Sequence, residues 1–575
     1  MSSISIETLR HSCAHLLAHA VKELYPTVQV TIGPVIEDGF YYDFYYESSF
    51  SISDLSIIED KMREISARKL EISRVVYSRK EAIDYFNSIG EFFKSKIVDR
   101  IPESEEITLY RQGSFIDLCR GPHVENTGLL QYFKLLKVSG SYWQGDSTSY
   151  KLQRIYGTIW HTRNELSDHI TMLEESEKRD HRFLGKQLSF FHFQEQSPGM
   201  PYWHPHGWTL YQLIVSYIRN KLAENQYQEI STPILADQTL WESSGHWEKF
   251  SEHMFTTVSE HKNYAIKPMN CPNHVQLFNQ NLHSYRELPI RYAEFGSCHR
   301  NEYSGTLHGL LRVRAFVQDD AHIFCTRQQV PLEVLNFINL LKDVYKDFGF
   351  SKIIYALATR PVLRVGDDAV WDEAEQSLKK TLESLSVTWF EKKGEGAFYG
   401  PKIEFILEDC LKRKWQCGTI QCDFSMPLRL GASYVNEESA KTTPVMLHRA
   451  ILGSLERFIG ILIEHYAGAL PLWLSPVQCK ILTISESSKP YAHQVAEQLK
   501  NSLIRSEVDI RNEKIGLKIR ESTLNKIPYL VIVGEKEMQN GMVSVRKRGK
   551  GDIGNLSLNE FISIINEQIH SKIAF

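Results

Sequence analysis

A strongly charged segment, residues 164–186, is the feature that most restricts how this chain can fold. Its helical pattern has little apolar face, which is typical of a solvated linker helix rather than of a helix packed in a core. We therefore expect a domain boundary there. The chain has 575 residues, far more than one cooperative core holds, so we expect roughly three or four domains.

The composition argues against a membrane protein and against a disulfide-bonded secreted protein. Hydrophobic residues make up 42% and charged residues 24% of the chain, and no apolar run reaches the roughly 18 residues that a membrane span requires. Residues 1–10 lack the basic and apolar regions of a secretion signal. The nine cysteines are scattered and odd in number, which indicates reduced thiols. We expect a cytoplasmic protein.

The segment before the linker predicts a compact α+β domain. Its pattern indicates helices over residues 8–24 and 54–69, a β-hairpin over residues 30–46 and strands over residues 107–110 and 115–118.

The segment after the linker predicts a large mixed domain and a small α/β domain. We expect the large one to span residues 190–468 and to close with a helix over residues 445–466. In the small one we expect alternating strands and helices, with strands at 480–484, 508–511, 529–533 and 543–546 and helices at 491–504 and 558–569.

Residues 295–302 (Phe-Gly-Ser-Cys-His-Arg-Asn-Glu) and 311–316 (Leu-Arg-Val-Arg-Ala-Phe) predict two strands joined by a polar loop. This arrangement would direct Arg300, Glu302 and Arg312 into one cleft. Planar guanidinium groups suit phosphate, and Phe316 could stack on a base. Taken alone, the segment is equally compatible with a hairpin whose charges are merely solvated.

These residues resemble motif 2 of class II aminoacyl-tRNA synthetases, and residues 453–458 (Gly-Ser-Leu-Glu-Arg-Phe) resemble motif 3. Further stretches narrow the resemblance to the threonyl-tRNA synthetases, and it runs from about Ile6 to the C-terminus. They are residues 267–272 (Lys-Pro-Met-Asn-Cys-Pro), 318–322 (Gln-Asp-Asp-Ala-His), 399–404 (Tyr-Gly-Pro-Lys-Ile-Glu), 415–421 (Trp-Gln-Cys-Gly-Thr-Ile-Gln) and 445–449 (Val-Met-Leu-His-Arg).

The resemblance implies a multidomain α/β and α+β protein with an antiparallel class II core flanked by helices. The implied domains are an editing domain (1–160), a linker helix (161–186), a catalytic domain (187–468) and an anticodon-binding domain (469–575). The implied activity is activation of L-threonine with ATP and Mg²⁺, transfer of threonine to tRNA(Thr), and hydrolysis of mischarged seryl-tRNA(Thr). A homodimer formed through the catalytic domain is also implied.

In this family one zinc ion sits in the amino-acid pocket, and the matching residues are Cys271, His322 and His448. Their sequence spacing alone does not predict a metal site, since single residues of this kind are usually a core Cys or a hydrogen-bonded His. Three protein ligands leave the metal an open position. Threonine can fill it with its hydroxyl and valine cannot, whereas serine lacks only a methyl group, worth about 1–3 kcal/mol. A second, editing site is therefore expected.

The first domain contains His11 and His15 on a predicted helix, and Cys119 and His123 in a turn. By residue type these four groups would suit zinc, a metal-free hydrolytic site, or simply packing between elements. The related editing domain of alanyl-tRNA synthetases uses such a set for metal. The resemblance to the threonyl family implies instead a metal-free pocket, with Asp117 and Lys94 as further members.

The resemblance also implies roles in activation and transfer. Arg300 would hold the α-phosphate and Arg457 the γ-phosphate, while Glu302 and Phe316 would hold the adenine. The remaining matches are Arg312, Gln416 and Thr419 for ATP, Asp320, Gln318, Tyr399 and Gln421 for threonine, and His246 and Lys402 for transfer to the ribose. A lone His after Gly is often structural, and that interpretation of His246 stays open.

For the last domain the resemblance implies anticodon contacts by Asn512, Glu537 and Arg546. Residues 511–516 and the basic run 546–548 would supply donors and positive charge. A basic run is more often a solvated face. The net charge of −4 decides nothing here, because phosphate contacts depend on local patches of Lys and Arg.

The sequence departs from the family pattern in three places. The family pattern has a small N-terminal domain, which we expect to be lacking here because the sequence begins at the linker that would follow it. Asn273 and Ala315 stand where Gly is usual, and a positive φ there would suit Asn better than Ala. Two other functions remain to be separated, a non-catalytic RNA-binding paralogue and a free-standing trans-editing hydrolase. The intact motifs argue against both.

Overall fold

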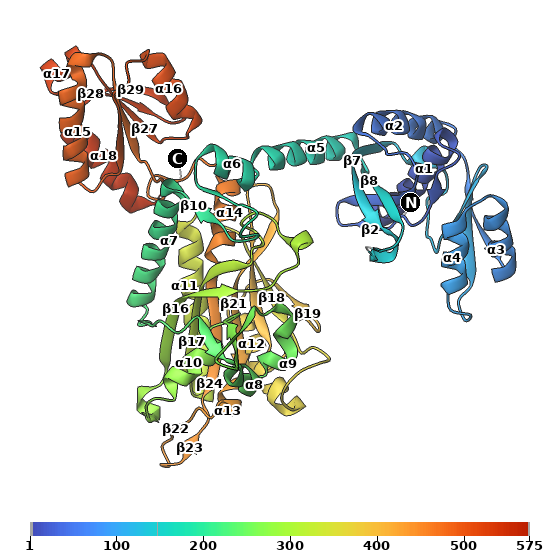
Figure 1. Cartoon of the computed structure of the whole chain (residues 1–575), viewed down its shortest axis with the longest axis horizontal. Helices are drawn as coiled ribbons and strands as arrows, with labels where there is room; N and C mark the ends of the chain where they lie inside the picture. Colours follow the sequence, from blue (N-terminus) through green and yellow to red (C-terminus); the bar gives the residue numbers. More distant parts are fainter. Residues whose placement is uncertain (1–3, 147, 573–575) are drawn as a thin grey trace. The chain divides into compact units, whose positions relative to one another are not determined.

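The structure, a computed structural model, describes residues 4–146 and 148–572 (Figure 1). The chain divides into two compact units, Met1–Glu174 and Glu175–Phe575. In the part of the chain that is described, no helix is long and apolar enough to cross a membrane.

The N-terminal unit is built on a five-stranded antiparallel sheet in the order β1-β3-β8-β7, with β2 paired to β3. Helices α1 and α2 pack on this sheet and bury its main apolar core. The hairpin predicted around Asp38-Gly39 is confirmed, because Ile36 pairs with Gly39. The bounds are α1 Ile6–Leu24, α2 Ile52–Ala67, β1 Gln29–Val30, β2 Val35–Ile36, β3 Gly39–Tyr45, β7 Tyr132–Tyr142 and β8 Lys151–Trp160.

A second sheet in this unit has the order β4-β5-β6 and is packed by α3 and α4. Strand β6 ends one residue before Cys119, and α4 carries Lys94. The bounds are β4 Ile72–Tyr77, α3 Arg79–Ser88, α4 Phe92–Arg100, β5 Ile107–Gln112 and β6 Phe115–Leu118.

The charged linker differs from the single helix that the sequence predicted. It forms two helices, α5 (Arg163–Lys178) and α6 (His181–Gln187). The carboxylate of Asp180 accepts a hydrogen bond from the Arg182 amide at 2.7 Å and so caps the start of α6. An aspartate inside a run of charged residues gives no sign, in sequence alone, that it starts a new helix.

The C-terminal unit contains an eight-stranded sheet in the order β11-β16-β17-β24-β21-β20-β18-β19, antiparallel except at its two outer pairs. Helices α7, α11, α12 and α14 contribute to the large core beside this sheet. The bounds are α7 Pro205–Glu224, β11 Gln228–Glu229, β16 Ile290–His299, β17 Ala315–Cys325, α11 Val330–Asp347, β18 Ile353–Ala358, α12 Asp368–Ser384, β19 Trp389–Lys392, β20 Lys402–Glu408, β21 Lys414–Asp423, β24 Val445–Ser454 and α14 Leu455–His465.

Shorter elements surround this sheet. Two three-stranded sheets have the orders β12-β14-β13 and β15-β22-β23, and β9 pairs with β10. The bounds are β9 Phe191–His192, β10 Tyr202–Trp203, β12 Leu235–Asp237, α8 Gln238–Ser244, α9 His246–Phe250, β13 Thr256–Ser259, β14 Lys262–Ile266, α10 Cys271–Phe278, β15 His283–Ser284, α13 Met426–Arg429, β22 Tyr434–Val435 and β23 Lys441–Thr442.

The single helix predicted over residues 445–466 was wrong. Its first half is the inner strand β24 and its second half is helix α14. The eight residues 445–452 are all buried. A largely apolar run, interrupted here only by His448 and Arg449, fits a buried strand as well as a helix. The Ser454 side chain caps α14 by accepting a hydrogen bond from the Arg457 amide at 3.2 Å.

The last part of the chain forms the expected small α/β domain, with sheet order β26-β25-β27-β28-β29. The first three strands are mutually parallel, and β28 and β29 continue antiparallel. Helices α16 and α17 and strand β29 were not predicted. The bounds are β25 Cys479–Thr483, α15 Lys489–Asn501, β26 Ser506–Asp509, α16 Ile515–Leu524, β27 Tyr529–Val533, α17 Glu535–Asn540, β28 Met542–Lys547, β29 Gly551–Ser557 and α18 Leu558–Ser571.

Candidate active site

Strand β17 supplies much of the candidate site in the C-terminal unit. Successive side chains of a strand point to opposite faces, so every second residue shares a face. Phe316, Gln318, Asp320 and His322 have this spacing. On the neighbouring strand β24, His448 is the register partner of His322. The face shared by β17 and β24 therefore carries both an aromatic ring and polar side chains.

Cys271, His322 and His448 form a buried cluster. His322 Nε2 lies 3.1 Å from His448 Nδ1, which lies 3.3 Å from Cys271 Sγ. The cysteine stands at the first turn of α10, and the histidines come from adjacent strands. Three residues far apart in the sequence are therefore brought together, with one potential ligand atom of each within 4.8 Å of the others.

The outer ring nitrogens of both histidines have protein partners. His448 Nε2 lies 3.0 Å from Asp423 Oδ2. His322 Nδ1 lies 2.9 Å from His274 Nδ1, and His274 Nε2 lies 3.0 Å from Glu294 Oε2. Such contacts fix the orientation of a ligating imidazole. The donor set and its support fit a zinc ion.

Three residues predicted to bind threonine lie beside this cluster. The Asn270 amide donates to Asp320 Oδ2 at 3.0 Å, and burial raises the pKa of Asp320 above its ordinary value. The Tyr399 hydroxyl donates to Gln421 Oε1 at 2.8 Å, and the Tyr399 ring contacts that of His448, with centroids 5.0 Å apart.

Next to the cluster, a cavity of about 280 Å³ is lined by Gln318 and by every residue predicted to bind ATP. These are Arg300, Glu302, Arg312, Phe316, Gln416, Thr419 and Arg457. The Arg300 guanidinium lies over the Phe316 ring, 5.1 Å from its centroid. Arg312 pairs with Glu302, its Nη2 lying 2.8 Å from Oε2. Arg300 and Arg457 form no ion pair within the described part of the chain, and two such arginines with an aromatic face in one cavity suit a triphosphate and a base.

The two residues predicted to act in transfer have different surroundings. His246 is fully buried, and its Nδ1 lies 2.8 Å from Ser244 Oγ. Burial, with the charges of His448 and Arg429, lowers the pKa of His246 to about 4, so the ring is neutral near neutral pH. Lys402 is paired with Glu404 at 2.7 Å.

In the N-terminal unit, the four predicted His and Cys residues also come together. Cys119 Sγ lies 3.0 Å from His11 Nε2 and 3.1 Å from His123 Nε2. His123 Nδ1 lies 3.0 Å from the hydroxyl of Ser12, and the rings of His15 and His123 touch, with centroids 4.4 Å apart.

A cavity of about 340 Å³ adjoins this second cluster. In its wall Lys94 is paired with Asp117, and both contact Tyr42, whose hydroxyl donates to Asp117 Oδ2 at 2.6 Å. Burial lowers the pKa of His123 to about 2 and raises the pKa of the Cys119 thiol to about 11. The cluster is thus neutral at physiological pH, beside a buried ion pair.

The predicted anticodon residues are spread over the last domain. Asn512 is exposed after β26, Glu537 accepts from the Gly534 amide at 3.0 Å, and Arg546 on β28 lies 4.0 Å from Asp552. Arg548 does not supply a free charge as the sequence suggested. Its guanidinium donates to backbone carbonyls, among them Leu470 O at 2.7 Å, and is buried by them.

Three family descriptions match the chain. They are "tRNA synthetase class II core domain (G, H, P, S and T)" over residues 255–466, "Anticodon binding domain" over 478–568, and "Threonyl and Alanyl tRNA synthetase second additional domain" over 107–156. The threonine–tRNA ligases of Nitrosomonas europaea and Legionella pneumophila (strain Corby) are each 59% identical to it, covering 99% of this chain and 90% and 89% of theirs. The chain belongs to the threonyl-tRNA synthetase family.

A solved structure agrees with this assignment. The RNA-binding domain of threonyl-tRNA synthetase from Cryptosporidium parvum Iowa II is 42% identical and superposes with a TM-score of 0.66, covering 68% of this chain and 98% of that one. Ligation of threonine to tRNA is the activity of the family, and the second additional domain supports editing beside it. A free-standing editing hydrolase is excluded, since the synthetase core is matched too.

Neither of the two glycine replacements in this synthetase strains the backbone. Asn273 lies within α10 and Ala315 begins β17, and neither has a positive φ. The sequence did not predict the parts played by His274, Asn270, Asp423 and Tyr42. Asn270 and His274 flank Cys271 within four residues, which was the one available signal. Asp423 and Tyr42 reach their sites only through folding.

Proposed function

We propose that Cys271, His322 and His448 hold one zinc ion and that L-threonine is recognised there. The proposal is carried by one observation: three buried ligand atoms converge, and the outer nitrogen of each histidine is held by a protein partner, His448 by Asp423 and His322 by His274. When bound, the zinc would supply open coordination positions for the amine and the hydroxyl of threonine, and valine, which lacks the hydroxyl, could not fill both.

The residues around the cluster would complete the amino-acid pocket. Asp320 would accept hydrogen bonds from the zinc-bound amino group of threonine, because a buried carboxylate with an unpaired charge is costly. Tyr399 and Gln421, already hydrogen-bonded to each other, would fix one wall, and Gln318 lies between this pocket and the nucleotide cavity. A substrate lacking the hydroxyl would leave polar groups unpaired.

The ATP cavity would act mainly by positioning and by neutralising charge. Arg300 would hold the α-phosphate and Arg457 the γ-phosphate, with Mg²⁺ on the nucleotide. Phe316 offers a ring face to the adenine, and Glu302 an acceptor to its amino group. The other three lining residues, Arg312, Gln416 and Thr419, would contact the phosphates and the adenylate.

Transfer to the tRNA would involve His246 and Lys402. The pKa of His246, lowered to about 4 by burial, keeps the ring neutral, and its Nε2 is buried without a protein partner. A neutral imidazole with an unused nitrogen can accept a proton from a ribose hydroxyl. Lys402 would contribute positive charge.

The N-terminal cluster would hydrolyse seryl-tRNA(Thr) without a metal. Its histidines are neutral, so they can orient and deprotonate water. The ammonium group of Lys94 lies close by, paired with Asp117. Its positive charge opposes a second cation in the same cavity and would stabilise negative charge that develops on the ester oxygen.

The remaining proposals concern partners. The anticodon of tRNA(Thr) would be read by Asn512, Glu537 and Arg546. Arg548 would not take part, because its guanidinium donates hydrogen bonds to backbone carbonyls of this chain. The chain would form a homodimer through the catalytic domain and work in the cytoplasm. Size-exclusion chromatography with light scattering tests the dimer, and a mass of one chain would rule it out.

Activation is tested by threonine-dependent exchange of labelled pyrophosphate into ATP, with valine and serine as matched competitors. Threonine should support exchange, valine should not, and serine should do so weakly because a single methyl separates it from threonine. Metal analysis of the same preparation should find about one zinc per chain. Absence of exchange with threonine would refute the activation proposal.

Editing is tested by hydrolysis of seryl-tRNA(Thr) and threonyl-tRNA(Thr) by the purified protein, with and without a chelator that leaves the buried zinc in place. Seryl-tRNA should be hydrolysed at the same rate in both conditions. Selective loss of hydrolysis with the chelator would show that the editing site does use a metal.

A further inference from the structure

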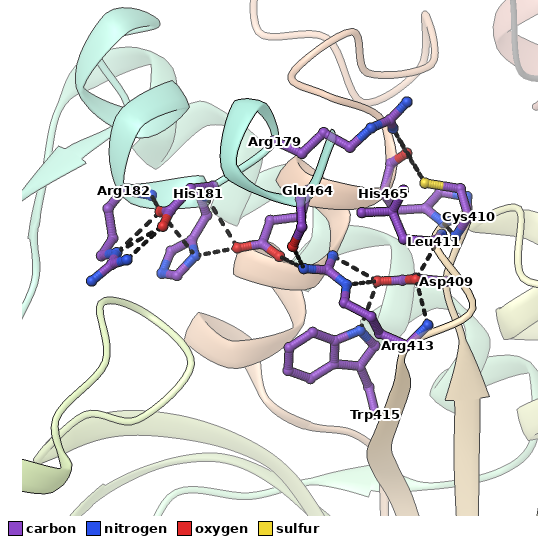
Figure 2. A network of polar contacts seen from close by, with 12 residues as sticks. Arg179, His181, Arg182, Asp409, Cys410, Leu411, Arg413, Trp415, Glu464 and His465 are labelled. Carbon is purple, nitrogen blue, oxygen red and sulfur yellow. Dashed lines mark hydrogen bonds and ion pairs between the residues drawn. The ribbon is translucent and has the colours of Figure 1, made fainter. Parts of the chain in front are cut away.

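A polar network at the start of α6 lies apart from both sites and is used by none of the proposed steps (Figure 2). It joins the linker to the end of α14 and to the turn between β20 and β21. At its centre His181 is fully buried, at 0% exposure. Figure 2 shows His181 facing Glu464, with Arg413 on the other side of that carboxylate.

Both ring nitrogens of His181 are occupied. Nδ1 lies 2.6 Å from Glu464 Oε1, and the backbone N–H of His181 donates to the same oxygen at 3.1 Å. Nε2 accepts a hydrogen bond from the Leu310 amide at 2.9 Å. Because an amide can only donate here, Nε2 must be unprotonated and the proton must sit on Nδ1. One imidazole therefore connects an acceptor on α14 to a donor 129 residues away in the sequence.

The group Asp180, His181 and Glu464 is close enough to hold a metal, but its oxygens have other partners. Arg182 pairs with Asp180 at 2.6 Å, and Arg413 pairs with Glu464 at 2.7 Å. Burial tends to raise the pKa of Glu464, but the hydrogen bonds from His181 outweigh it, so the pKa is lowered and the carboxylate is charged. Its charge is already matched by an arginine, and a cation site is not indicated.

Leu310 belongs to the loop between β16 and β17, which carries three of the residues proposed to bind ATP, Arg300, Glu302 and Arg312. The loop backbone lies directly against the imidazole. Gly309 has a φ of +50°, and a Cβ built on it would lie 2.2 Å from His181 Nε2. Leu310 itself is fully buried. The loop is therefore fixed at its tip by one buried hydrogen bond, two residues before Arg312.

We propose that His181 is a positioning residue for this loop: by accepting the Leu310 amide it sets Arg312 and Glu302 for ATP. This rests on the ATP roles proposed above. The loop is also held by Leu310 and Leu311, whose side chains pack in or against the large core, and by contacts near its ends, such as the Arg314 amide donating to Gly199 O at 2.7 Å. Without the His181 contact, the buried Leu310 amide would lose its acceptor, and the loop would shift to satisfy it.

Two substitutions separate the two functions of the ring. In His181→Asn the side-chain amide nitrogen can replace Nδ1 and keep the bond to Glu464, but nothing reaches Leu310. In His181→Gln the side-chain oxygen can replace Nε2 and keep the bond to Leu310. Gly309→Ala is a third variant, which disturbs the contact from the loop side: its Cβ would clash with the His181 ring, and its φ of +50° suits alanine poorly.

The test is pyrophosphate exchange with ATP and threonine varied separately. We expect the KM for ATP to rise about tenfold in His181→Asn and Gly309→Ala, which is the effect of losing about one buried hydrogen bond. In His181→Gln the KM for ATP should stay within about twofold of that of the unmodified protein. The KM for threonine and the zinc content should not change in any variant. Equal KM values for ATP in the Asn and Gln variants would overturn the inference, as would a parallel rise in the KM for threonine.

These results are distinguishable from failure of the proposed function. If the unmodified protein shows no threonine-dependent exchange, the ATP and threonine roles fail. If it exchanges and the Asn and Gln variants differ only in thermal stability, His181 is a purely structural residue and the positioning role is wrong.

Discussion

The two His and Cys clusters of this protein contain the same residue types in different surroundings. Cys271, His322 and His448 are closed off in the core. The cluster of His11, His15, Cys119 and His123 borders an open cavity, with three of its four members only partly buried. Proximity of metal-binding side chains is thus common to both and cannot by itself identify a metal site.

The surroundings of the two clusters differ in charge. Behind His448 stands Asp423, whose Oδ1 is held by the amides of Ser425 and Met426 and which offers its charge to the imidazole. Behind His15 stands Asp117, but Lys94 already neutralises it. A carboxylate that remains free to balance a dication favours zinc, and one that is paired with an ammonium group favours a metal-free site.

The largest effect should come from removing a ligand of the first cluster. Cys271→Ser or His322→Ala should release the zinc and reduce threonine-dependent exchange by more than about 100-fold. Substituting only the hydrogen-bond partner of a metal ligand already lowers metal affinity or activity by about 10- to 100-fold. The matched variants Cys119→Ser and His123→Ala should retain both zinc and exchange. Zinc content and pyrophosphate exchange are measured for all four variants. If the second cluster were the metal site, Cys119→Ser and His123→Ala would lose the zinc, and Cys271→Ser and His322→Ala would keep it.

The reverse separation is expected for editing. His11→Ala and His15→Ala should slow hydrolysis of seryl-tRNA about 100-fold or more, as loss of a general base or water-orienting group does. Activation of threonine should be unchanged. Accumulation of seryl-tRNA in a charging reaction measures the effect, and its absence in both variants would remove the editing role from this cluster.

A smaller effect should follow from weakening the support of a ligand. Asp423→Asn keeps the size of the side chain but removes its charge, so zinc affinity should fall about 10- to 100-fold. Competition with a chromogenic chelator measures it. The equivalent change in the other cluster, Asp117→Asn, should leave the zinc content unchanged, although it removes the negatively charged partner of Lys94.

The smallest effect is a pH dependence confined to the second cluster. Burial lowers the pKa of His11, His15 and His123 in the folded protein, whereas in the unfolded chain it is about 6.5. The unfolded state thus binds more protons below that pH, and stability is lost as pH falls, by up to about 1.4 kcal/mol per pH unit for each histidine.

Hydrogen exchange of α1 peptides in the full chain, between about pH 7.5 and about pH 5.5, measures this loss after correction for intrinsic rates. His123→Gln should remove one histidine's share of the slope. A slope unchanged by that substitution would mean that His123 is not buried in its neutral form.

The sequence was sufficient for elements whose patterns are local, such as the periodicity of α1 and the Asp38-Gly39 turn, which are readable in short windows. In the large domain it predicted only a few of the strands and helices that the structure has. Residues 445–452 are apolar apart from His448 and Arg449, so length and burial, which only the fold supplies, decided between strand and helix. The division of the linker at Asp180 likewise depends on a side-chain cap and on contacts with α14.

The candidate sites were found through the resemblance, and their supporting residues were not. Cys271 and His448 are 177 residues apart, so no spacing rule joins them. Asp423 meets His448 because β21 pairs with β24, Tyr42 meets Asp117 and Lys94 from another sheet and a helix, and the contact of His181 with Leu310 crosses 129 residues. Arg548 shows the converse, a basic residue whose charge the fold uses internally.

Strand β17 carries Phe316 and Gln318, which line the cavity proposed for ATP, and then Asp320 and His322, which belong to the pocket proposed for threonine. Because a strand advances about 3.3 Å per residue, the separation of the two reactants is set by chain length within this one segment. Inserting or deleting a single residue there would turn half of these groups to the opposite face. We therefore expect variation in this enzyme to enter by substitution along β17 and never by a change in its length.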